Sequence, residues 1–177
     1  FVVNIVRIFM LYIQCRDDAC SAQTRKCLRS ADGWLFFGHS DEAFKELDFV
    51  PEADNYLPIV LLARNRILIE LKQWRTVANL CLSALEKYPD CDEFFVQRCF
   101  ALRKMGRREM ASDTISAAPE ILKATGVIYY NVACYEARFG DTEIARDYLR
   151  RAIEANHYME VNAMNDPDLR ALYDTCP

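Results

Sequence analysis

The sequence repeats at a spacing of 34 residues, and this period limits the folds open to the chain more than any other feature. Four rows of that length align without insertion or deletion: residues 24–57, 58–91, 92–125 and 126–159. One column of this alignment holds Gly38, Lys72, Gly106 and Gly140. Three of the five glycines of the chain therefore share one position of the repeat.

Small residues recur at two further positions of each row. One column, five residues after the glycine column, holds Ala43, Val77, Ala111 and Ala145. Another column holds Ala31, Asn65, Cys99 and Ala133. Glycine adopts the left-handed conformation that ends a helix at little cost, and small residues allow two helices to cross closely. Each row therefore predicts a hairpin of a first and a second helix, with one apolar stripe left for the next hairpin to cover.

A unit of this length, with glycine and small residues at these positions, resembles the tetratricopeptide repeat. The resemblance covers residues 24–157 and is closest in the last row, which contains YYNVACYEARFGDTEIARDYLRRAIEANH. It implies an all-α solenoid of four tetratricopeptide-like helical hairpins. Residues 160–177, which contain VNAMNDPDLRALYD, resemble the polar helix that caps such arrays, with Asp166 or Asp168 beside Pro167 as the helix start.

Two departures from the repeat pattern carry structural predictions. Lys72 stands in the glycine column, which costs about 1 kcal/mol if the left-handed conformation is kept. Pro51 and Pro119 directly follow the last small residue of rows one and three. Because proline cannot continue a helix, the second helices of these rows should end a turn early, and rows two and four should have the longer second helices.

Residues 1–23 precede the repeats and begin with FVVNIVRIFMLYI, which is apolar except for Asn4 and Arg7. The stretch is too short for a membrane span and lacks the basic start of a signal peptide, so we expect no membrane contact. As a helix it is apolar almost all round, which predicts burial. It could cover the open end of the first repeat, pair with a second copy in a homodimer through residues 1–20, fill the groove, or belong to a targeting element. The chain begins at Phe1, which leaves upstream sequence open.

Composition and charge exclude several classes of protein. Of the 177 residues 52% are hydrophobic and 27% charged, which predicts one ordered domain. A net charge of −4 argues against sequence-independent nucleic-acid binding, so we expect no nucleic-acid partner. The eight cysteines form no CxxC pair and have no histidine close in sequence, which argues against a zinc site. They are typical of small buried residues in a reducing compartment, so a cytoplasmic location is expected.

Familiar catalytic motifs are missing from the sequence. There is no glycine-rich phosphate loop, no GxSxG elbow and no HExxH pair. His39 and His157 fall in turns, where a lone side chain is usually solvated. Acidic pairs such as Asp41 with Glu42 are typical of helix starts, and the basic runs are typical of solvated helix faces. We expect no catalytic residue, no metal and no cofactor.

The resemblance implies that the first helices of successive repeats line a concave groove that binds a peptide. Six basic residues against three acidic ones in its columns give the groove a net charge of +3, which predicts an acidic partner segment with apolar anchors. Leu62, Phe100 and Tyr130 would supply pockets, although neighbouring helices should cover about a third of the apolar positions. The candidate groove residues are Arg25, Arg29, Phe36, Leu62, Arg66, Val96, Phe100, Arg103, Lys104, Tyr130, Asn131 and Arg138.

The sequence therefore predicts a non-catalytic module that binds a protein or peptide partner. Some members of the family hold a C-terminal carboxylate with a Lys and Asn clamp, but only one residue of each matching set fits here, so this mode is not expected. Three alternatives stay open. The protein could be a small tetratricopeptide chaperone of the type III secretion class that dimerises through its N-terminal helix, an enzyme with an unrecognised site, or a self-assembling surface.

Overall fold

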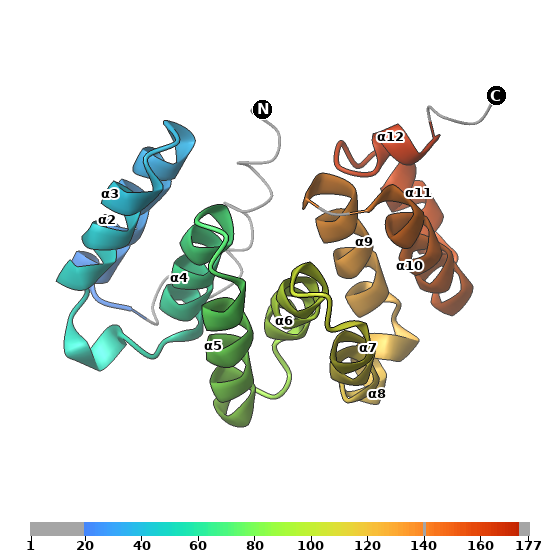
Figure 1. Cartoon of the computed structure of the whole chain (residues 1–177), viewed down its shortest axis with the longest axis horizontal. Coiled ribbons are helices and arrows are strands. Elements are labelled where there is room, and N and C mark those ends of the chain that lie inside the picture. The colour runs from blue at the N-terminus through green and yellow to red at the C-terminus, as the bar shows by residue number, and fades with distance from the viewer. Residues whose placement is uncertain (1–19, 140, 174–177) are drawn as a thin grey trace. The chain divides into compact units, whose positions relative to one another are not determined.

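A computed structural model of the chain describes residues 20–139 and 141–173. Helices and turns account for all the secondary structure in this range, which contains no strand (Figure 1). The all-α prediction is confirmed. The chain divides into two compact units, residues 1–80 and 81–177, with the boundary inside helix α5 (Trp74–Lys87). The predicted N-terminal helix and its homodimer contact lie outside the described residues.

The first unit contains α2 (Ala22–Phe36), α3 (Ser40–Glu46), α4 (Pro58–Glu70) and the start of α5. Two short 3-10 helices, η2 (Leu47–Phe49) and η3 (Glu52–Asp54), connect α3 to α4. Ser21 caps α2, since its hydroxyl accepts a hydrogen bond from the backbone N–H of Thr24 at 3.2 Å. Pro58 opens α4, where the missing N–H of proline costs no helical hydrogen bond.

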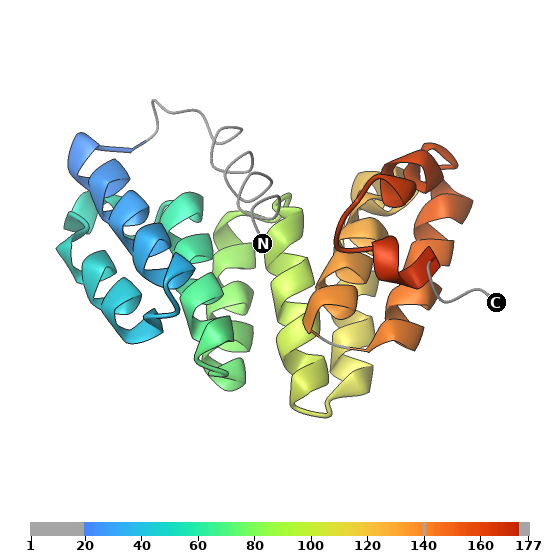
Figure 2. The ribbon, with the colours of Figure 1, turned by 90° about the horizontal axis from the view of Figure 1, so that it is seen from above.

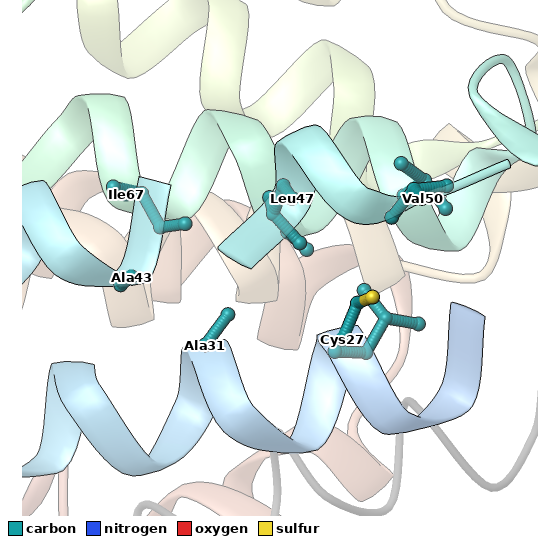
Figure 3. Packing of buried hydrophobic residues seen from close by; sticks show 9 residues of the cluster. Cys27, Ala31, Ala43, Leu47, Val50 and Ile67 are labelled. Carbon is teal, nitrogen blue, oxygen red and sulfur yellow. The ribbon is translucent and has the colours of Figure 1, made fainter. Parts of the chain in front are cut away.

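The core of the first unit lies between α2, α3 and α4 (Figure 3). Ala31 and Ala43 are buried, as expected of the small-residue columns, and leave room for the helices to approach. Leu47 and Ile67 fill the space beside them and are shielded from solvent. Burial of each such branched side chain contributes about 1.5 to 3 kcal/mol, so this cluster holds the hairpin to the helix that follows.

The second unit begins with the end of α5 and contains four longer helices, a short connector and a C-terminal pair. These elements are α6 (Asp92–Lys104), α7 (Arg108–Ser116), α8 (Glu120–Ala124), α9 (Val127–Phe139), α10 (Thr142–Ala155), α11 (Tyr158–Met164) and α12 (Arg170–Tyr173). Helices α9 and α10 lie side by side (Figure 2). The small-residue positions Cys99, Ala111, Ala133 and Ala145 are buried at the helix crossings.

One turn recurs in the glycine column of the repeat. At Gly38 the backbone N–H donates to the Leu35 carbonyl at 3.0 Å, and the next N–H donates to the carbonyl of Trp34 at 2.9 Å. The same two hydrogen bonds close the turns at Lys72 and Gly106, which identifies a Schellman end to each first helix. Lys72 keeps the left-handed conformation with φ 58°, as the column predicts, whereas Gly140 lies outside the described residues.

The proline prediction is confirmed. Helices α3 and α7, which belong to the rows with Pro51 and Pro119, contain 7 and 9 residues. Helices α5 and α10 contain 14 residues each. Both prolines have an extended backbone, with ψ 143° and 141°, and start short connectors toward the next row. The chain thus alternates between rows with short and long second helices.

The C-terminal segment differs from the expected single polar cap. It contains two short helices, and the turn before α12 begins at Asp166, whose side chain accepts a hydrogen bond from the backbone N–H of Asp168 at 3.1 Å. The exposed side of α11 carries Tyr158, Val161 and Met164, so its outer face is less polar than predicted. Hydrophobic side chains on a terminal helix reduce the solvation that a polar cap would provide.

Candidate partner-binding surface

In the first unit the candidate groove residues lie on α2 and α4. Arg29 and Phe36 are exposed on α2, whereas Leu62 is half-buried on α4. The guanidinium of Arg25 donates to the backbone carbonyl of Cys20 at 2.6 Å, so part of its hydrogen-bonding capacity is used at the start of α2. Arg29 and Phe36 are therefore the most accessible of the predicted residues in this unit.

Arg66, also in the first unit, forms an ion pair with Asp32. Its Nη1 lies 2.8 Å from Asp32 Oδ1, and the two side chains are 25% and 23% exposed. The two residues stand at the same position of successive rows, so the pair links α2 to α4. Burial raises the pKa of Asp32, and the neighbouring Arg66 opposes that rise. The charge of Arg66 is thus largely compensated within the unit.

Arg103, in the second unit, is tied to a carboxylate that the sequence columns did not include. Its Nε lies 2.7 Å from Oε1 of Glu136, and the side chains are 16% and 3% exposed. The other carboxylate oxygen of Glu136 accepts a hydrogen bond from the backbone N–H of Asp141 at 3.2 Å. The ion pair therefore joins α6, α9 and the start of α10. The prediction that Arg103 belongs to an open basic groove is corrected, because the carboxylate of Glu136 in the same unit neutralises its charge.

The apolar candidates of the second unit are also buried. Val96 and Phe100 are 1% exposed and Tyr130 is 4% exposed. The Phe100 ring lies 5.5 Å from the ring of Tyr135, and the Tyr130 hydroxyl donates to Asp166 at 2.7 Å. The expectation that Phe100 and Tyr130 offer pockets to a partner is corrected, because neighbouring side chains of the same unit cover them.

Asn131 joins α9 to the beginning of α6. Its side-chain amide donates to Asp92 Oδ2 at 2.6 Å. Burial, together with a hydrogen bond and the charge of the adjacent Glu93, raises the pKa of Asp92 to about 7, against the lowering effect of the Asn131 hydrogen bond. This hydrogen bond helps to hold α6 against α9, and Asn131 remains half-buried.

Lys104 and Arg138 are the candidate residues of the second unit that stay exposed. They occupy the same position of successive rows, in the last turns of α6 and α9. Gln97 donates to the Tyr135 hydroxyl at 3.3 Å. This contact falls between the Asp92 contact and the Arg103 contact on both helices, so α6 and α9 run in the same direction. Lys104 and Arg138 therefore lie at the same end of one helix pair.

The described residues do not assemble a familiar reactive centre. Residues 20–139 and 141–173 contain no group of three His, Cys, Asp or Glu side chains that could hold a metal. Six cysteines of this range take no part in a disulfide. Burial raises the pKa of the Cys99 thiol to about 12, which keeps it protonated and unreactive near neutral pH. No helix within the described ranges has both the length and the apolar character to cross a membrane.

Comparison with known proteins supports the fold. No protein-family model matches the sequence, and no curated protein matches it. A solved structure of MamA, an RS-1 ArsTM double mutant, matches with a TM-score of 0.57 over 88% of this chain and 92% of the MamA chain. MamA contains tetratricopeptide repeats. The fold of this chain is tetratricopeptide-like. Because the two sequences are 16% identical, the likeness to MamA establishes the fold alone.

Proposed function

We propose that the protein is a non-catalytic interaction module whose first helices bind an acidic segment of a partner protein. The observation that carries this proposal is the exposed basic pair Lys104 and Arg138, one repeat apart on parallel helices. Carboxylates of a partner can pair with both side chains, and the planar guanidinium of Arg138 is suited to two-point contact. The tetratricopeptide-like fold supports a role in protein interaction.

The support beneath Lys104 and Arg138 favours binding without rearrangement. The Arg103–Glu136 ion pair and the Asn131–Asp92 hydrogen bond hold α6 against α9 in the free protein. A partner therefore meets a rigid pair of helices, and little conformational entropy of the receptor is lost on binding. Each exposed ion pair contributes about 0.2 to 1 kcal/mol and is screened by salt, so affinity should fall as ionic strength rises.

The location of this interaction is part of the proposal. Partly exposed cysteines outside any disulfide, such as Cys20, Cys91 and Cys134, are typical of a reducing compartment, which supports the cytoplasm. In the first unit, exposed Phe36 and half-buried Leu62 are the candidates that remain for apolar side chains of a partner.

The test uses short random peptides displayed on phage and selected against the full chain. Acidic peptides should be enriched, and synthetic copies should bind with affinities that fluorescence anisotropy can measure. Charge reversal by Lys104→Glu with Arg138→Glu should weaken the binding of these acidic peptides at least about tenfold. The matched variant Lys26→Glu with Arg108→Glu changes the net charge equally at exposed positions of α2 and α7, and should change affinity less than about twofold. Equal losses in both variants, or no acidic peptides, would contradict the proposal.

A further inference from the structure

A second candidate binding surface lies on the second helices α5 and α7, apart from the candidate groove residues. The end of α5 and helix α7 flank a groove of 510 Å³ that opens to solvent, with α6 beneath it. None of its lining residues belongs to the candidate groove residues. A volume of this size is within the range of sites that hold a ligand or a few side chains of a partner.

Both walls of this groove present the same pair of chemical groups. On α5, Leu82 is followed one turn later by Glu86, and on α7, Met110 is followed by Asp113. Leu82 is 48% exposed and Met110 42% exposed, whereas Phe95 on α6 is buried beneath them. Large apolar side chains exposed on two facing helices indicate a contact surface, since solvated helix faces are normally polar.

The charge at the rim of the groove is negative. Glu86 and Asp113 are exposed, and no ion pair joins either carboxylate to a cation in the part of the chain that the structure describes. Arg98 also lines the groove, but it is half-buried and its Nε donates to the Thr114 hydroxyl at 3.3 Å. The carboxylates are therefore the charged groups most accessible to a partner.

We propose that the groove between α5 and α7 binds a basic partner segment that carries an apolar side chain. The apolar side chain contacts Leu82, Met110 and the Phe95 floor, while Lys or Arg residues of the segment pair with Glu86 and Asp113. A basic segment fits better than a second copy of this chain, because the chain has a net charge of −4. The site is independent of the acidic-segment site, which has the opposite charge and lies on first helices.

The experiment uses basic peptides from the same phage selection on the full chain, prepared synthetically and measured by fluorescence anisotropy. Glu86→Lys with Asp113→Lys should weaken their binding at least about tenfold. Asp90→Lys with Glu109→Lys is the matched control, because it changes the net charge equally at exposed positions outside the groove. The control should alter affinity less than about twofold. Circular dichroism verifies that both variants fold.

A second pair of variants tests the apolar contact. Met110→Gln should weaken basic peptides by about fivefold, whereas Met164→Gln, at another exposed methionine, should have no effect. Several results would overturn the proposal: no enrichment of basic peptides, equal losses in the two charge variants, or no response to Met110→Gln. Sedimentation that detects a dimer of the wild-type chain, lost on Met110→Gln, would also overturn it by making a second copy the occupant. Loss of basic-peptide binding on Lys104→Glu with Arg138→Glu would place the peptides at the other site.

Discussion

Each unit contains an ion pair between an arginine and a carboxylate on neighbouring first helices, and the two ion pairs differ in burial. In the first unit the Arg66–Asp32 pair is about a quarter exposed on both sides. In the second unit Glu136 is 3% exposed and also accepts a backbone hydrogen bond. The cost of removing one partner depends on whether water can reach the charge that remains. The difference in burial predicts that substituting Arg103 lowers the unfolding free energy more than substituting Arg66.

The largest effect is expected at the buried pair. Arg103→Met leaves the buried carboxylate of Glu136 without its partner and should cost about 3 kcal/mol of unfolding free energy. Arg66→Met leaves Asp32 partly solvated and should cost about 1 kcal/mol or less. Urea unfolding followed by far-ultraviolet circular dichroism measures both. The fluorescence of Trp34 and Trp74, which both belong to the first unit, gives a second signal for that unit. Equal costs for the two substitutions would show that burial does not separate the two pairs.

An intermediate effect is expected from two aspartates whose pKa values move in opposite directions. In the second unit, the raised pKa of Asp92 means that the folded chain holds a proton that the unfolded chain releases. Its contribution to stability is complete below the ordinary carboxyl pKa and is lost as pH rises through about 7. Asp92→Asn should therefore remove about 1 to 2 kcal/mol of the stability decline between about pH 5 and about pH 8.

Asp54 of the first unit provides the opposite case. The Thr24 hydroxyl donates to it at 2.6 Å and the Ser21 N–H at 2.9 Å, and these bonds lower its pKa. The stability that Asp54 contributes is present above the ordinary carboxyl pKa and is lost as the pH falls through the lowered pKa of the folded state. Asp54→Asn should therefore change stability on the acid side only, as urea unfolding across a pH series would reveal. A flat pH difference for both variants would disprove the contrast.

The smallest effect concerns the recurring turn. Lys72 of the first unit and Gly106 of the second both have positive φ, at 58° and 74°. Lys72→Gly should raise the unfolding free energy by about 0.5 to 1 kcal/mol, because it relieves the left-handed strain of a side-chain residue. Gly106→Ala should lower it by about 1 kcal/mol, and the added Cβ meets no atom within 4 Å, so conformation alone decides the sign. Thermal unfolding that shifts in the same direction for both would contradict this account.

Much of the fold could be predicted from the period. The glycine column marked the Schellman turns at Gly38, Lys72 and Gly106, because this backbone conformation depends on local sequence. Pro51 and Pro119 marked the short second helices for the same reason. These features are set by residues close to one another in the chain, so a single sequence is enough to find them.

The candidate site could be predicted less well, because it depends on contacts between rows. Glu136 neutralises Arg103 from a position just outside the groove columns, and nothing local indicated that it would. Asp166, which lies 36 residues away in the C-terminal segment, accepts a hydrogen bond from the Tyr130 hydroxyl and helps to cover that side chain. Column position therefore could not separate the exposed Lys104 from its buried neighbour Phe100. The groove between α5 and α7 lies on second helices, whereas the resemblance implied binding residues on the first helices.

The central claim is that Lys104 and Arg138 mark the surface that binds an acidic segment. The most direct measurement is a nuclear magnetic resonance titration of the ¹⁵N-labelled full chain with an acidic peptide from the selection. The account predicts chemical-shift changes concentrated in the last turns of α6 and α9, and their loss in the Lys104→Glu with Arg138→Glu variant. Changes centred elsewhere, with Lys104 and Arg138 unaffected, would contradict it.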